Sequence, residues 1–173
     1  KTKRSSGFTN NWQQALIALA LSTASGGFLF GAMSFLLPRY FEINLASLST
    51  NVAITGIFAG IVYACASFAQ VAIGWLIDRI SPRIVLFWIS IGQVIFIYLA
   101  SQFENLSLFF LSIAAMSFVF GQIPITDTIL VRYVPDDWRS RVLSAKFLLN
   151  LCIGASVLPF TSYLLRIGYD LSL

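Results

Sequence analysis

The sequence predicts an all-α membrane protein, a polytopic bundle of five transmembrane helices, and its composition and apolar runs support this. Of the 173 residues, 58% are hydrophobic and 10% are charged, whereas a soluble domain carries about 25% charged residues. The apolar runs are continuous, unlike barrel strands, which alternate apolar and polar residues over about ten positions. Because every backbone polar group must be paired within hydrocarbon, such runs are expected to be helices.

Five segments approach the roughly 20 apolar residues that cross a bilayer core. They are residues 15–37, 52–77, 84–100, 106–130 and 142–165. The second holds 26 uncharged residues, while the third holds 17 and is expected to borrow flanking residues. Residues 1–14 are predicted to be a cytoplasmic tail or an inter-domain linker, and residues 15–173 one transmembrane helical domain.

The distribution of basic residues predicts how the helices are oriented. If all five segments cross, the N-terminal tail and the loops after the second and fourth segments share one side. These carry eight Lys and Arg residues, namely Lys1, Lys3, Arg4, Arg79, Arg83, Arg132, Arg139 and Arg141. The other side carries only Arg39 and Arg166. Because basic loops stay in the cytoplasm, the N-terminus is expected to be cytoplasmic, with the protein in the plasma membrane, such as a bacterial inner membrane.

A short charged loop after the second segment carries a recognisable pattern. It reads Gly74-x-Leu76-x-Asp78-Arg79-x3-Arg83-x2-Leu86. This resembles the signature loop of the major facilitator superfamily (MFS) of secondary transporters, roughly Gly-x-Leu-x-Asp-Arg-x-Gly-Arg-Arg-x-x-Leu. Two positions depart from that pattern, because Ser81 replaces the usual Gly and Pro82 replaces a basic residue.

Those two departures are more typical of the copy in the family's C-terminal half. The stretch from Gly121 to Asp127 and the basic loop 132–141 are similar to that half's tenth helix and the loop that follows it. The resemblance therefore implies helices seven to eleven of a six-helix half. The N-terminal half remains the alternative, although residues 154–159 echo its antiporter signature only faintly. The chain lacks an initiating Met and ends without a tail, so a fragment of a longer protein is expected.

The resemblance implies a secondary active transporter of small solutes that works by rocker-switch alternating access. Its expected partners are the lipid bilayer, the other transporter half and a small-molecule substrate of unknown identity, with a proton or ion as a coupling candidate. No phosphate-binding loop for ATP is found, no cofactor or metal is expected, and the net charge of +4 does not indicate nucleic acid. An enzyme is not expected, because the chain has no His to act as a base. A non-transporting membrane scaffold or a channel subunit remains the alternative.

By the resemblance, the loop acts as a gate on the cytoplasmic side. Asp78 would hold that side closed in the outward-open state, and Arg132, at the end of the fourth segment, is its predicted partner. The alternative is a solvated loop charge that only sets topology. The expected gating residues are Gly74, Leu76, Asp78, Arg79, Arg83 and Arg132.

Two charged residues interrupt apolar segments, and ionisable groups at membrane depth are functional hypotheses by default. Asp127 and Lys146 both fall near the predicted cytoplasmic interface, where Lys146 can extend toward water. Asp127 is predicted to pair with Arg132 or Lys146, in a gate or ion pair, and interfacial anchoring and proton coupling remain alternatives. The candidates for cytoplasmic ion pairs are Asp127, Arg139, Arg141 and Lys146.

The first and fourth segments would line the central cavity if the resemblance holds, although ordinary helix packing is an alternative for each residue. The cavity candidates are Ser22, Ser25, Phe30, Met116, Phe120 and Gln122. The amides of Gln70, Gln93, Gln122 and Asn150 each need a hydrogen-bond partner in lipid. The stripes Gly27-x3-Gly31 and Gly56-x3-Gly60 are predicted to be close helix contacts.

Overall fold

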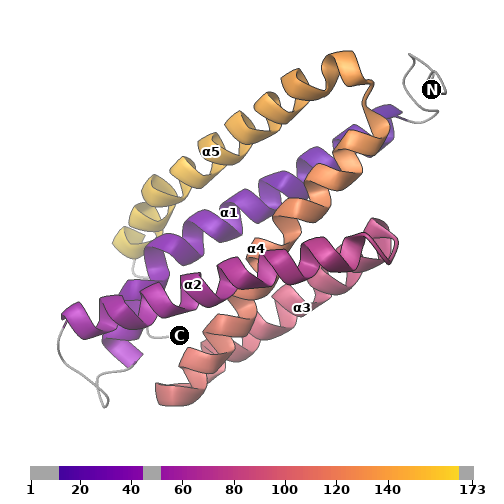
Figure 1. The fold of residues 1–173 in the computed structure, drawn as a ribbon. Coiled ribbons are helices and arrows are strands. Elements are labelled where there is room, and N and C mark those ends of the chain that lie inside the picture. Colours follow the sequence, from indigo (N-terminus) through magenta and orange to yellow (C-terminus); the bar gives the residue numbers. More distant parts are fainter. Residues whose placement is uncertain (1–11, 45–51, 168–173) are drawn as a thin grey trace.

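The computed structural model describes residues 12–44 and 52–167, and these form five α-helices (Figure 1). The helices are α1 (Trp12–Asn44), α2 (Val52–Ile77), α3 (Pro82–Gln102), α4 (Asn105–Tyr133) and α5 (Asp136–Ile167). Each of the five is long and apolar enough to cross a membrane. The predicted all-helical fold and its five spanning segments are therefore confirmed, whereas the MFS-type arrangement stays a prediction.

The helices extend beyond the apolar runs that predicted them. The shortest segment does borrow its neighbours, because α3 begins at Pro82 and ends at Gln102. Pro82 is the first residue of α3 and is buried. Proline suits this position, since its missing N–H would have no partner in the first turn. The departure of Pro82 from the family pattern thus has a local structural reason.

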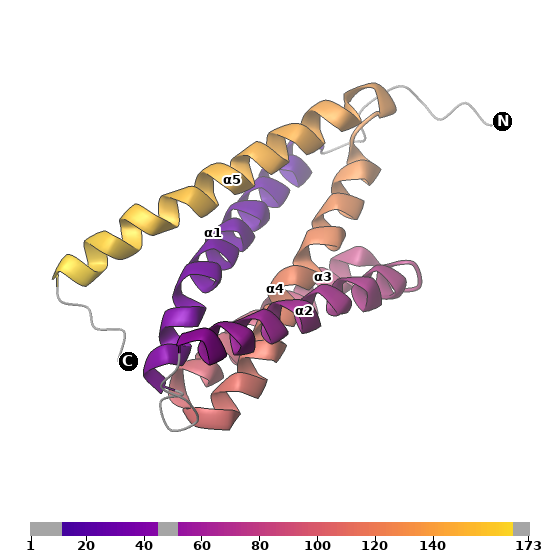
Figure 2. The same cartoon turned by 60° about the vertical axis from the view of Figure 1, so that its left-hand side comes forward.

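Helix α4 is the centre of the bundle. Helices α2 and α3 pack along it, α1 also contacts it, and α5 packs mainly against α1. Both views show α4 and α5 diverging from the short turn that joins them (Figures 1 and 2). Helix α4 contributes buried residues along its length, including the fully buried Leu108, Met116 and Ile125. The space between α4 and α5 is consequently bounded by α1.

The contact between α1 and α5 depends on glycine. A Cβ atom on Gly31 would lie 2.9 Å from the carbonyl oxygen and 3.0 Å from the Cα of Gly154, both backbone atoms of α5. A Cβ on Gly27 would lie 2.4 Å from Asn150 Oδ1. The first glycine stripe is therefore a close helix contact, as predicted. The stripe of α2 is not, because neither Gly56 nor Gly60 has a described atom within 4 Å of its Cβ position.

Proline in α4 is accommodated by a neighbouring side chain. Pro124 has no N–H, so the carbonyl of Phe120 loses its helical donor. Gln70 of α2 donates its Nε2 to that carbonyl oxygen at 3.3 Å. A freed backbone carbonyl within a membrane needs such a partner. Gln70 was predicted to need a hydrogen-bond partner, and the Phe120 carbonyl that Pro124 leaves without a donor is that partner.

The outer surface of the bundle is apolar. Large side chains such as Phe68, which is 77% exposed, and Tyr98 and Trp88 project outward. Exposed apolar surface of this extent is unfavourable in water and favourable in lipid. Together with the five long apolar helices, it indicates an integral membrane protein.

Candidate functional site: a polar network and a cavity between α1, α4 and α5

A chain of hydrogen bonds crosses the bundle from α3 to α1 through one glutamine. Gln93 of α3 donates its Nε2 to Gln122 Oε1 at 3.0 Å. The Nε2 of Gln122 in turn donates to the carbonyl oxygen and the hydroxyl of Ser22, at 3.0 and 2.9 Å. Gln93 and Gln122 are both buried. Their amides thus satisfy each other, and Gln122 fixes α4 relative to both neighbouring helices.

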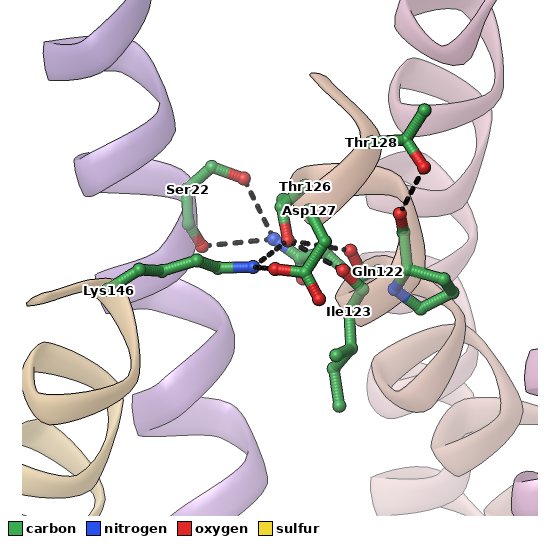
Figure 3. Close-up of polar contacts among 8 residues, drawn as sticks. Ser22, Gln122, Ile123, Thr126, Asp127, Thr128 and Lys146 are labelled. Atoms are coloured by element: carbon green, nitrogen blue, oxygen red, sulfur yellow. Dashed lines mark hydrogen bonds and ion pairs between the residues drawn. The ribbon is translucent and has the colours of Figure 1, made fainter. Parts of the chain in front are cut away.

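One turn further along α4, an ion pair joins α4 to α5. The Lys146 ammonium donates to Asp127 Oδ1 at 2.5 Å and to Thr126 Oγ1 at 2.7 Å. Thr126 itself donates to the carbonyl oxygen of Gln122 at 3.0 Å. Figure 3 shows the Lys146 side chain extending from α5 across to α4, beside Ser22 of α1. The predicted pairing of Asp127 with Lys146 is confirmed, and the pairing with Arg132 is not formed.

The two charges differ in their exposure to the surroundings. The Lys146 side chain is 14% exposed and the Asp127 side chain is 45% exposed. A charged group in a low-dielectric setting is costly unless it is paired and hydrogen-bonded. Lys146 meets this requirement through Asp127 and Thr126, while Asp127 keeps one side of its carboxylate open.

This ion pair borders a cavity of about 410 Å³ between α1, α4 and α5. The cavity lies where α4 and α5 diverge, and polar and apolar side chains both line it. The lining residues are Ser22, Thr23, Gly26, Phe30, Val119, Gln122, Ile123, Thr126, Asp127, Leu143, Lys146, Phe147, Asn150 and Leu151. Its size falls within the range of about 300–1,000 Å³ that is usual for small-molecule sites.

Three of the six predicted cavity residues lie in the cavity wall, namely Ser22, Phe30 and Gln122. The other three do not. Met116 is fully buried in the core, the Phe120 ring packs against Phe30 with 5.4 Å between the ring centroids, and Ser25 is exposed but does not line the cavity. The prediction chose helices correctly but not their faces, because polar residues are too sparse on α1 and α4 to define a face.

The contribution of α5 was not predicted. Leu143, Lys146, Phe147, Asn150 and Leu151 all line the cavity. Their spacing of three or four residues places them on one face of a helix. That periodicity, together with Lys146 and Asn150 within it, was the available signal in the sequence.

The loop that carries the family pattern lies at the end of the bundle where α2 ends and α3 begins. Gly74 has open space at its Cβ position, and Leu76 packs against the apolar cluster around Ile77 and Ile125. The guanidinium of Arg79, in the turn after α2, lies 3.8 Å from the ring centroid of Trp75 in α2. That of Arg83 lies 5.6 Å from the Tyr133 ring centroid, so Arg83 links the loop to the end of α4.

The predicted pairing of Asp78 with Arg132 is absent from this structure. Both side chains are exposed, and neither forms an ion pair or side-chain hydrogen bond with any residue in 12–44 or 52–167. The reason is geometric, because α2 and α4 cross and their ends diverge in both views (Figures 1 and 2). The pairing was predicted for the outward-open state, and for that state it stays a prediction.

The other basic residues near this end form local contacts. Arg139 pairs with Asp136 at 2.6 Å and donates to the carbonyl oxygen of Val131 at 3.3 Å, which ties the start of α5 to the end of α4. The Arg141 guanidinium lies 5.1 Å from the Trp138 ring centroid. Of the predicted ion-pair candidates, Asp127, Lys146 and Arg139 form ion pairs within the described residues, and Arg141 does not.

Comparisons with protein-family models, curated proteins and solved structures found no match for this chain. The fold and the site therefore define the class of protein: residues 12–44 and 52–167 form five helices suited to crossing a membrane, with a largely apolar cavity that an ion pair borders among three of them.

Proposed function

We propose that this chain is part of a secondary active transporter of small solutes, and that the cavity between α1, α4 and α5 is part of its substrate pathway. The observation that carries the proposal is the Asp127–Lys146 pair on the wall of this cavity. Charged residues within transmembrane segments commonly face a water-filled cavity and mark solute or ion pathways. A helix-packing role alone would not require an open space of about 410 Å³ beside the pair.

The loop from Gly74 to Leu86 supports placing the chain in the major facilitator superfamily, within the C-terminal half as helices seven to eleven. The basic end of the bundle, which carries Arg79, Arg83, Arg132, Arg139 and Arg141, is then cytoplasmic. Rocker-switch alternating access would open the cavity to either side by movement against a second half. Asp78 is exposed at this end, where it is accessible to a partner on that half.

Uptake by membrane vesicles tests this proposal. Vesicles containing the full-length protein are given a panel of radiolabelled amino acids, sugars, nucleosides, organic acids and amines, with and without an ionophore that collapses ion gradients. We expect at least one solute to accumulate above its external concentration and the ionophore to abolish that accumulation. Equilibration without accumulation would indicate a channel subunit, and no protein-dependent flux of any solute would indicate a scaffold.

Two variants connect transport to the site. Lys146→Met removes the ammonium from the cavity wall and is expected to lower uptake at least tenfold. Lys146 is replaced by a chain of similar length, so the apolar contacts of its stem are retained. The matched control is Arg141→Met, on the same helix but stacked on Trp138 outside the cavity, for which uptake is expected to change less than twofold. Equal losses in both variants would contradict the assignment of the cavity.

A further inference from the structure

Two polar side chains on the cavity wall have no partner within the described residues. Thr23 is 5% exposed, and its hydroxyl makes no hydrogen bond in 12–44 or 52–167. A helical Thr can usually donate to the carbonyl three or four residues earlier, as Thr128 does to Pro124 at 2.8 Å. The Asn150 amide likewise forms no hydrogen bond with that part of the chain. Buried polar groups are normally satisfied, so the Thr23 hydroxyl points to a ligand. The Asn150 amide is only partly buried and is available to contact the same ligand.

The side chains that line the cavity carry no net charge. Asp127 and Lys146 are the two ionisable residues among those that line the cavity, and they neutralise each other. Lys146 uses two of its three N–H donors, on Asp127 and Thr126. Asp127 accepts through Oδ1, so its other carboxylate oxygen is available. The wall thus offers donors and acceptors without a net charge for a ligand to compensate.

The rest of the wall is apolar. Its hydrophobic side chains are Phe30, Val119, Ile123, Leu143, Phe147 and Leu151. A ligand with a net charge would place an ion, which no charge of the wall compensates, against these apolar side chains, and this is less favourable than placing a neutral head there. An apolar body would pack against the six side chains, two of which are aromatic. The favoured ligand therefore combines an apolar body with a polar head of zero net charge.

We propose that this cavity binds a small amphipathic solute that is uncharged or zwitterionic. Its head is hydrogen-bonded by Thr23, Asn150 and the Asp127–Lys146 pair, and its body lies against Phe30 and Phe147. As a statement of substrate class this rests on the proposed transport function, but binding is measurable without transport.

Four probes with one phenylpropyl body separate the effect of head-group charge. They are 3-phenylpropanamide (uncharged), L-phenylalanine (zwitterionic), 3-phenylpropylamine (cationic) and 3-phenylpropanoate (anionic). Calorimetric titration of the full-length protein in lipid nanodiscs is expected to show at least one of the first two binding tenfold or more tightly than either ion. Comparable binding of an ion, or no binding of any probe, would overturn the proposal.

Variants then test whether the wall sets this preference. Lys146→Met leaves the wall with the Asp127 charge and is expected to shift the preference to the amine, and Asp127→Asn is expected to shift it to the carboxylate. Retention of the wild-type order in both would overturn the proposal. A third variant, Thr23→Val, leaves the charge of the cavity wall unchanged. It is expected to weaken the preferred probe at least fivefold without lowering thermal stability, because it removes a hydroxyl with no described partner.

The matched control is Thr128→Val, whose hydroxyl bonds within α4 and does not line the cavity, and for which probe affinity is expected to stay within twofold of the wild type. Equal weakening by the two Thr variants would overturn the role of Thr23. Neutral-probe binding without gradient-driven uptake would remove the transport function but not this inference. Gradient-driven uptake of charged solutes alone would support the transport function and overturn this inference.

Discussion

The contact between α1 and α5 makes a quantitative prediction, because the chain contains two glycine stripes in opposite surroundings. Gly31→Ala places a methyl group against the backbone of Gly154, at 2.9 Å from its carbonyl oxygen. Gly60→Ala places the same group where no described atom lies within 4 Å. Both substitutions add the intrinsic preference of Ala over Gly in a helix, about 0.5–1 kcal/mol. Their difference therefore measures the cost of the contact.

That cost follows from the geometry. Ordinary contact begins near 3.4 Å, so α1 and α5 must separate by about 0.5 Å at Gly31. A gap of this size forfeits about a quarter of each dispersion contact, and each contact contributes about 0.1–0.2 kcal/mol. Over several tens of atom pairs along two long helices, the loss is about 1–2 kcal/mol. Gly31→Ala is thus expected to be less stable than Gly60→Ala by about that amount.

Equilibrium unfolding in mixed detergent and SDS micelles, followed by tryptophan fluorescence, measures this difference. Gly31→Ala should unfold at a lower SDS fraction than the wild type, and Gly60→Ala at the same fraction or a higher one. Equal stability of the two variants, or a gain for Gly31→Ala, would refute the close packing of α1 on α5 and with it the wall of the cavity.

Three further predictions use the same unfolding assay or hydrogen exchange. Asp127→Asn and Lys146→Met should each lower the free energy of unfolding by about 1–3 kcal/mol, which is less than for a fully buried pair because Asp127 is half-exposed. The double variant should recover most of that loss, and additive losses would contradict the ion pair. Gln122→Leu should lower the free energy of unfolding by about 2 kcal/mol, since it removes three hydrogen bonds of about 0.6 kcal/mol each in a membrane. Gln102→Leu should leave it unchanged, because the Gln102 side chain is exposed. Arg83→Ala should speed amide exchange at the end of α4 by removing the contact with Tyr133, and Arg79→Ala should not; matching effects would refute that link.

The helices were predictable because lipid imposes a strong constraint. Length and apolarity alone identified all five, including α3, whose apolar run is short and which recruits Pro82 at its start. Helix ends were less predictable, because helices continue into polar flanks, as α1 does through Arg39 to Asn44. Backbone hydrogen bonding favours such extension once a helix has formed.

The site was predictable where a residue type was costly, and less so elsewhere. Asp127 and Lys146 interrupt apolar segments, and because an unpaired charge is unfavourable in lipid, the sequence predicts that they pair. The pairing of Asp78 with Arg132, predicted for the outward-open state, is not formed in this structure and stays a prediction, because a linear sequence places charges at a membrane level but does not define how α2 and α4 cross. The hydroxyl of Thr23 could not be singled out, since only the packed structure reveals that it has no hydrogen-bond partner among the described residues.

Side-specific labelling of the cavity tests the central claim most directly. Cys65 and Cys152 are the two cysteines of this sequence and are exposed, so both are first replaced by Ala in the full-length protein, together with any cysteine outside this sequence. A single cysteine at Asn150 then reports on the cavity, and one at Ser140 or Ser101 reports on each end of the bundle. With a membrane-impermeant thiol reagent, alternating access predicts that Asn150→Cys reacts from both sides of the membrane, while Ser140→Cys and Ser101→Cys each react from one side, opposite to each other. Reaction of Asn150→Cys from one side only, or from neither, would contradict the account.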